Sequence, residues 1–461
     1  MELILHQVIE NLKEIIEKSD DLLIEGGLSE LNIVLKKVID ESMANIVGEI
    51  LSNLDEELRE NEQRKIDYEI VNRHEKNIET IFGNVNYERT YYKNKKSGEY
   101  KHLLDELINV KPHMRKTLNL EARLINEAID LSYYKSGQKA VESSVLSSTS
   151  TMNSIRNIGS IPNNEVEIKE RNKKKKILYI EADEDHVASQ NGKPLEPKLV
   201  YVHEGYEEVS KYKDSKRRKI KNPRYFSGMY SNSDELWVEV LDYLTKAYDY
   251  EYIDKIYISG DAALWIKNGV NWIPKAKYVL DRFHLMKYVK KMTAHLDKSY
   301  EKKTWKFIRK NKKQELEVLF KVIKEETKVE TKLDSVKDSI RYIKRHFKAI
   351  LRYYKDDYSG CSAEGHVSHI LSDRLSSRPL GWSRVGVDAM SKLRVFAANG
   401  GNIFKYVRKK FKESKNKIKE RKMIKRISKK VKSKVNDINV EIPVIKRGLK
   451  NGSYCAVNSL R

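Results

Sequence analysis

The segment from Lys176 to Val187 constrains the fold more than any other part of the chain. Its residues alternate in an apolar run that ends in a cluster of acids, which is the pattern of a buried strand with carboxylates at its end. Because successive strand residues point to opposite faces, Asp183 and Asp185 are expected on one face. Carboxylates held close together at the end of a core strand repel each other unless a cation neutralises them. The segment therefore predicts a metal site at the edge of a sheet.

The net charge of +23 points to a polyanionic partner. Nucleic acid is favoured over an anionic membrane surface, because Lys and Arg side chains neutralise phosphates. The chain has 461 residues, a length for which about two to four domains are expected. Only Cys361 and Cys455 occur, which excludes a disulfide framework and a Cys-rich zinc site and suits a cytoplasmic protein. We find no signal peptide and no apolar run of membrane-spanning length.

Residues 1–80 are expected to form an N-terminal helical region. Apolar residues recur there at helical spacing on both sides of a Gly-Gly break. Residues 82–104 instead alternate like a β-hairpin with basic and aromatic faces. Such a hairpin suits either a ribbon that lies on DNA or a packed surface element.

Residues 81–165 as a whole are predicted to be a hairpin and helix-turn-helix-like DNA-binding region. Three short helices are expected between residues 118 and 157, the last of them opened by hydroxyl residues that can cap it. In a helix-turn-helix, residues 147–157 would enter the major groove. A simple three-helix packing unit has a similar pattern and remains the alternative.

Residues 172–400 are expected to form an α/β domain. Strands are predicted at residues 176–187, 199–203, 224–228, 255–261 and 276–281. Three antiparallel strands, a helix and then parallel additions are the order of a ribonuclease-H-like sheet. The highly charged residues 297–355 are interpreted as a helical insertion into this domain.

Three carboxylates lie where such a domain can use them. Asp183 ends the first strand, Asp261 ends the fourth, and Glu364 falls in the first turn of a late helix. Two Mg²⁺ or Mn²⁺ ions about 4 Å apart need hard oxygen ligands of this kind to act on a phosphate. Individually, the residues could also be an acidic turn, a helix N-cap or a dipole-stabilised first turn. Their joint pattern favours catalysis and metal binding, with Asp185 as a same-face neighbour or alternate ligand.

A basic C-terminal helix and tail is expected over residues 401–461. Residues 405–434 contain 16 Lys or Arg and two acids, and apolar residues recur there at helical spacing. This density favours phosphate contact over a merely solvated helix. The DNA-contact candidates from this segment are Lys409, Lys410, Arg421 and Lys422.

Other DNA-contact candidates surround the acids. Arg374, Arg378 and Trp382 could grip phosphate and stack on a base, or could form a rigid turn packed on the sheet. His284 could contact DNA or stabilise a helix start. A pair of His residues flanks Glu364, but a His-x-x-His pair with one Glu is a weak zinc signal.

Four motifs resemble those of the bacterial insertion-sequence transposases of the Lre group, many of whose members are described only as an uncharacterised protein family. The motifs are Glu181–Val187, Gly260–Ile266, Asp281–Leu285 and Glu364–Ser383. That group is similar to the Mutator-like DDE transposases, which have a ribonuclease-H-like catalytic domain with a helical insertion before the final Glu. The resemblance covers most of the chain. Two departures are Ala262, where a Gly is expected, and the Asp281–His284 stretch, where related transposases often have a Cys-x-x-His pair.

The sequence therefore predicts a DNA transposase that cleaves and joins strands at insertion-sequence ends without a covalent protein–DNA intermediate. Mg²⁺ or Mn²⁺ is the expected cofactor, double-stranded DNA the partner, and a homo-oligomer the form that synapses two ends. The alternatives are a ribonuclease-H-like structure-specific nuclease that cuts without joining, and a catalytically inactive DNA-binding protein.

Overall fold

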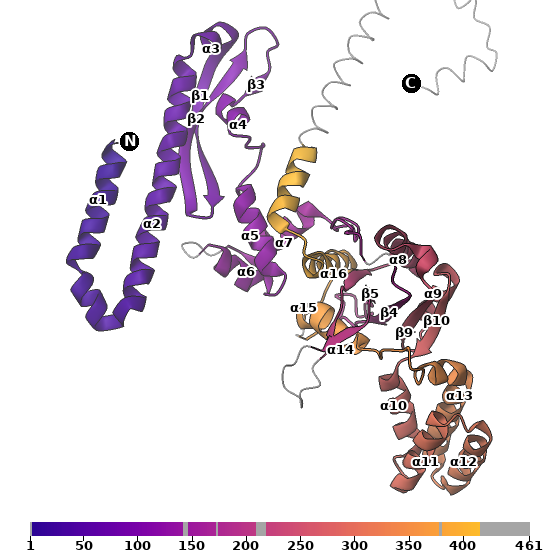
Figure 1. The fold of residues 1–461 in the computed structure, drawn as a ribbon. Helices are drawn as coiled ribbons and strands as arrows, with labels where there is room; N and C mark the ends of the chain where they lie inside the picture. Colours follow the sequence, from indigo (N-terminus) through magenta and orange to yellow (C-terminus); the bar gives the residue numbers. More distant parts are fainter. Residues whose placement is uncertain (1, 142–145, 172–173, 209–217, 378–379, 415–461) are drawn as a thin grey trace, which may run out of the picture. The chain divides into compact units, whose positions relative to one another are not determined.

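The computed structural model describes residues 2–141, 146–171, 174–208, 218–377 and 380–414. The chain divides into two units, Met1–Phe404 and Lys405–Arg461. The labelled helices and strands lie in the first unit (Figure 1). Of the second unit, residues 405–414 are described and are helical. No helix in these ranges is both long enough and apolar enough to cross a membrane.

The N-terminal part combines helices with a small sheet. Its helices are α1 (Glu2–Glu17), α2 (Ser19–Glu60) and α3 (Glu62–Asp67). Gly27 has a positive φ of 64° and interrupts α2 at the predicted break. The strands are β1 (Tyr68–Thr80), β2 (Gly83–Asn94) and β3 (Tyr100–Lys101), in the order β1-β2-β3.

The predicted N-terminal helical region, residues 1–80, differs from the structure in its last part, which is strand β1. Residues 69–75 are all exposed. This part of the strand therefore has no alternation of buried and exposed positions that the sequence could have revealed. Antiparallel pairing with β2 along its whole length imposes the strand conformation instead. The predicted return strand is reduced to the two residues of β3, because helix α4 (Leu103–Leu107) begins almost at once.

Three short helices follow, as predicted. They are α5 (Leu118–Ala128), α6 (Tyr133–Ala140) and α7 (Ser148–Ile158). The side chain of Ser147 accepts the Ser150 amide at 3.1 Å and caps α7, which confirms the expected hydroxyl cap. All three helices contact one another.

The central sheet has the strand order β10-β9-β4-β5-β8. Its strands are β4 (Ile177–Glu184), β5 (Lys198–His203), β8 (Arg224–Gly228), β9 (Lys255–Gly260) and β10 (Ala276–Leu280). Strands β4, β5 and β8 are antiparallel, whereas β9 is parallel to β4 and β10 is parallel to β9. This confirms the predicted order of antiparallel and then parallel strands. A separate ribbon pairs β6 (Tyr206–Glu208) with β7 (Arg218–Ile220).

The two faces of the sheet differ in chemistry. Leu178, Ile180 and Ala182 of β4 face an apolar core with α8 (Ser233–Ala247) and α9 (Leu264–Trp272). The opposite face carries Tyr, His and Glu side chains. The chain around Tyr358 and helix α16 (Arg384–Ala398) pack towards this second face. A short 3₁₀ turn, η1 (Tyr250–Tyr252), precedes β9.

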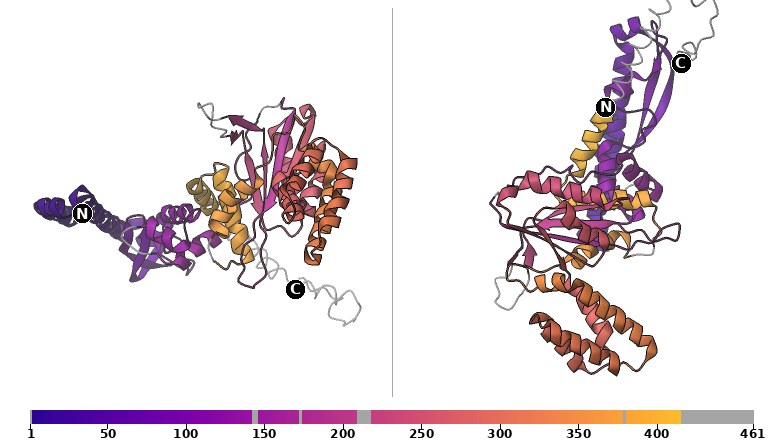
Figure 2. Two further views of the ribbon diagram at one scale, coloured as in Figure 1. Left: turned by 90° about the horizontal axis from the view of Figure 1, so that it is seen from below. Right: turned by 90° about the vertical axis from the view of Figure 1, so that its right-hand side faces the viewer.

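The predicted helical insertion is confirmed as helices. These are α11 (Lys298–Arg309), α12 (Lys313–Glu326) and α13 (Glu330–Arg352), which follow α10 (Arg282–Thr293). They pack with α10 into a bundle, seen in orange tones in Figures 1 and 2. The chain then returns to the sheet through α14 (Ala363–Val367), the π-helical turn η2 (Ser368–Ser372) and α15 (Asp373–Leu375).

Candidate functional site

Three acidic residues lie at one edge of the sheet, where neighbouring strands end. Asp183 is the last but one residue of β4, Asp261 follows β9, and Asp281 follows β10. Because these strands are parallel neighbours, the three residues share one edge. The amide of Asp281 donates to the carbonyl oxygen of Gly260 at 2.9 Å, which continues the pairing of β9 with β10 to this edge.

Gly260 allows β9 to approach β4 closely just before Asp261. A Cβ at this position would lie 2.4 Å from the carbonyl oxygen of Ala182 and 2.8 Å from the side chain of Ile266. No side chain fits into such a gap. The Ser-Gly-Asp sequence thus brings Asp261 to the strand that carries Asp183.

The carboxyl of Asp183 is buried and is affected by the negative charges of neighbouring carboxylates. It is 9% exposed. Burial, and then the charges of Asp261 and Glu364, raise the pKa of its carboxyl to about 7, although the Glu184 amide and His284 act in the opposite direction. The structure therefore brings the three predicted catalytic carboxylates into one electrostatic neighbourhood.

Asp261 and Glu364 are less buried than Asp183. Oδ1 of Asp261 accepts the amide of Ala263 at 2.8 Å, and Ala263, not Asp261, is the N-cap of α9. Glu364 lies in the first turn of α14 and is exposed. Its side chain is therefore accessible to a ligand.

Asp185 has a different environment from Asp183. Its Oδ1 accepts hydrogen bonds from the hydroxyls of Ser372 at 3.0 Å and Ser376 at 2.9 Å. Its Oδ2 is buried and has no hydrogen-bond partner. Asp185 thus ties the end of β4 to the η2–α15 segment.

His284 lies beside the acids. Its Nδ1 is 3.5 Å from Oδ2 of Asp281. The carboxylate of Asp281 raises the pKa of His284, burial lowers it, and Asp183 and Asp261 add to the increase. An imidazole whose pKa these carboxylates raise therefore borders the acidic edge.

The donors at this edge fit a hard divalent cation. Carboxylate oxygens predominate, and Mg²⁺ and Mn²⁺ prefer such ligands. The buried carboxyl of Asp183, whose charged form burial and neighbouring acids disfavour, is a feature that a cation would stabilise. In the described ranges, however, no three His, Cys, Asp or Glu side chains converge into a metal-binding group.

A buried carboxylate that the sequence analysis did not single out lies on the same strand face. Glu181 is fully buried, and its oxygens accept hydrogen bonds from Nε2 of His203 at 3.0 Å, the Tyr206 hydroxyl at 2.9 Å, the Tyr201 hydroxyl and the Ser362 amide at 2.6 Å. Burial alone would raise the pKa of Glu181, but these donors, His203 first, lower it. In the sequence, Glu181 has period-two spacing with Asp183 and begins the first of the four family motifs.

The two histidines near Glu364 point to different surroundings. His366 packs on the ring of Tyr201, with centroids 4.6 Å apart, and its Nδ1 is 3.1 Å from the Tyr225 hydroxyl. His369 is exposed beside Asp373. The pair does not form a zinc site.

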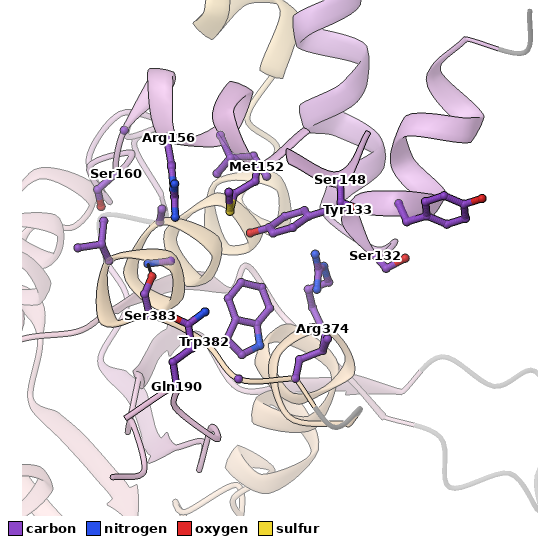
Figure 3. Close-up of a pocket in the computed structure, with 18 residues that line it drawn as sticks. Ser132, Tyr133, Ser148, Met152, Arg156, Ser160, Gln190, Arg374, Trp382 and Ser383 are labelled. Carbon is purple, nitrogen blue, oxygen red and sulfur yellow. Dashed lines mark hydrogen bonds between the residues drawn. The ribbon is translucent and has the colours of Figure 1, made fainter. Parts of the chain in front are cut away.

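Arg374 and Trp382 are buried, each 6% exposed. The Arg374 guanidinium lies 5.0 Å from the Tyr133 ring centre and 5.1 Å from that of Trp382, and its Nε donates to the Ala128 carbonyl. Figure 3 shows these side chains at a pocket of about 490 Å³. These contacts pack the turn against residues of α5 and α6, and not against the central sheet as the second interpretation expected.

The remaining DNA-contact candidates are only partly described. Lys409 and Lys410 lie on the helical residues 403–414, where Nζ of Lys410 is 3.6 Å from Glu413. Arg378, Arg421 and Lys422 lie outside the described residues.

Comparison with known proteins gives a family. The model of an uncharacterised protein family, UPF0236, matches residues 22–413. Two UPF0236 proteins of Caldanaerobacter subterraneus subsp. tengcongensis are each 37% identical over 452 residues, covering 95% of this chain and 94% and 89% of the relatives. A UPF0236 protein in the vanSb 3′ region of Streptococcus gallolyticus is 27% identical over 391 residues, covering 81% of this chain and 83% of the relative. The chain belongs to the uncharacterised protein family UPF0236.

Proposed function

We propose that this chain is a DNA transposase of the DDE type, which cleaves and joins DNA strands at the ends of an insertion sequence. The observation that carries the proposal is the placement of Asp183 and Asp261 at the same end of the parallel neighbours β4 and β9, with Glu364 in the first turn of α14 close enough for its charge to raise the pKa of Asp183. The strand order, three antiparallel strands extended by two parallel ones, supports a ribonuclease-H-like catalytic domain. The helical insertion before Glu364 suits the same comparison with the Lre group and the Mutator-like transposases.

Two further observations support the proposal. The net charge of +23 favours a nucleic-acid partner. The name of one similar relative joins eleven locus designations of a single genome. An element that copies itself leaves many loci in one genome that encode the same protein.

Each group of residues has a proposed role. Asp183, Asp261 and Glu364 would hold the divalent cations. Mg²⁺ or Mn²⁺ bound there would activate the attacking water or 3′-hydroxyl and stabilise the leaving oxygen. Helix α7 and the basic residues 405–434 would bind DNA, and two copies would synapse two ends.

The test uses the full chain and duplexes made from the DNA that borders its gene. With Mg²⁺ or Mn²⁺, the protein should nick these duplexes and join their 3′-hydroxyl ends to a target. Asp261→Asn should abolish both products and leave gel-shift binding intact, whereas Asp334→Asn, an exposed acid on α13, should keep full activity. Cleavage by Asp261→Asn, or without a divalent metal, would overturn the proposal. Nicked products without joined ones would identify a structure-specific nuclease.

A further inference from the structure

The acidic residues on one face of β4 have sharply different partners. Glu181 accepts the backbone amide of Ser362, the N-cap residue of α14, at 2.6 Å. Asp185 accepts the hydroxyls of Ser372 and Ser376, at the end of η2 and directly after α15. Asp183, between them, accepts only the amide of its own neighbour among the hydrogen bonds described for its side chain. The flanking acids therefore bind the two ends of one segment, and the middle acid binds neither end.

That segment carries Glu364 and has little to hold it in shape by itself. Helix α14 has five residues, η2 is a five-residue π-helical turn, and α15 has three residues. Helices this short are marginal without tertiary contacts. A Cβ on Gly365 would meet nothing within 4 Å, so the chain beside Glu364 is open on that side. The position of Glu364 therefore depends on the contacts that the segment makes with the rest of the fold.

Contacts with other side chains also hold the segment. Nη2 of Arg394, on α16, donates to the carbonyl oxygen of His369 at 2.6 Å, and its Nε donates to that of Ile370. This contact restrains the middle of the segment. The first turn, where Glu364 lies, is held by the Ser362 contact with Glu181 and by His366, which packs on Tyr201 and has its Nδ1 3.1 Å from the Tyr225 hydroxyl.

We propose that Glu181 and Asp185 are positioning residues that clamp residues 362–376 to β4 and thereby set the place of Glu364 relative to Asp183. The inference rests on the proposed function only in the role given to Glu364. Asp185 then acts through its serine partners and not as a metal ligand. Glu181 is suited to this task because His203, Tyr201 and Tyr206 hold its carboxylate rigidly from behind.

The first experiment measures the clamp without metal. Hydrogen–deuterium exchange is followed by mass spectrometry for peptides covering residues 362–376 of the full chain. Glu181→Gln and the double variant Ser372→Ala/Ser376→Ala should each speed exchange in this segment about tenfold, as expected when hydrogen bonds to a charged group are lost. Ser377→Ala is the matched control, because its hydroxyl bonds only to the carbonyl of Asp373 and not to β4. Unchanged exchange in both the Gln variant and the serine double variant overturns the clamp.

The second experiment separates positioning from metal ligation, using free Mn²⁺ counted by electron paramagnetic resonance. Asp185→Asn keeps an oxygen for the two hydroxyls, so its Mn²⁺ affinity should stay within about threefold of the parent, whereas Asp183→Asn should lose at least about tenfold. The serine double variant should lose about fivefold although it removes no ligand. Equal losses for Asp185→Asn and Asp183→Asn would make Asp185 a ligand and overturn its positioning role. If the parent protein binds no Mn²⁺, the proposed function fails, while the exchange measurement still decides the clamp.

Discussion

Replacing Asp183 by Asn should stabilise the metal-free protein while it removes strand cleavage. The pKa of this carboxyl is raised from 3.8 to about 7, by burial first and then by Asp261 and Glu364. A shift of roughly three pH units corresponds to about 4 kcal/mol of penalty on the charged form. Asn keeps an oxygen for the Glu184 amide, whose effect the pKa already includes, but it buries an NH₂ group for which no partner is described, which costs about 1–2 kcal/mol. The net gain in unfolding free energy should be about 2–3 kcal/mol at pH 8.

The pH dependence follows from the sign of the shift. The folded protein retains a proton on Asp183 that the unfolded chain has already released, so stability falls as pH rises between about 4 and 7 and is then level. The Asn variant lacks this slope. The unfolding free energy of the variant should therefore exceed that of the parent by about 2 kcal/mol more at pH 8 than at pH 5.

Urea unfolding in EDTA, followed by tryptophan fluorescence, measures this difference. All five tryptophans lie between Trp237 and Trp382, so the signal reports on the part of the chain that holds the central sheet. Asp334→Asn serves as the control and should change little at either pH, since its side chain is 81% exposed. Adding Mn²⁺ should reduce the difference in unfolding free energy between the variant and the parent, because only the parent protein is stabilised by the metal. A variant that is less stable than the parent at pH 8, or a gain that does not grow with pH, would refute the reasoning.

Three further predictions concern the strand pair, the buried arginine and the charge. Gly260→Ala places a methyl group 2.4 Å from the Ala182 carbonyl oxygen and should cost about 1–3 kcal/mol in urea unfolding, with loss of cleavage; a variant of full stability and activity would contradict the close approach. Arg374→Ala should cost about 2–4 kcal/mol and change DNA affinity by less than about threefold in fluorescence anisotropy; a large affinity loss at unchanged stability would restore its role in DNA contact. DNA affinity should fall at least about 100-fold between 50 and 200 mM KCl, and a flat response would contradict the role given to residues 405–434.

The sequence determined the central sheet and its acidic edge. The apolar runs before Asp183 and Asp261 marked two strands, and the comparison with a ribonuclease-H-like sheet predicted antiparallel strands followed along the chain by parallel ones. The placement of acids at strand ends could be derived because parallel neighbours end at one edge, whatever else packs around them. Asp281 also follows a parallel strand and so lies at the same edge. In the sequence it was considered only as part of the motif that contains His284.

Only the tertiary structure decided what each polar side chain touches. Strand β1 has an exposed, charged sequence, and its partner β2 makes it a strand. Glu181 and Asp185 look alike in the sequence, but one meets an amide 181 residues away and the other meets hydroxyls 187 and 191 residues away. Period-two spacing fixes the face to which a side chain points. The hydrogen-bond donors that the side chain meets on that face belong to distant segments, and only folding of the chain brings those segments together.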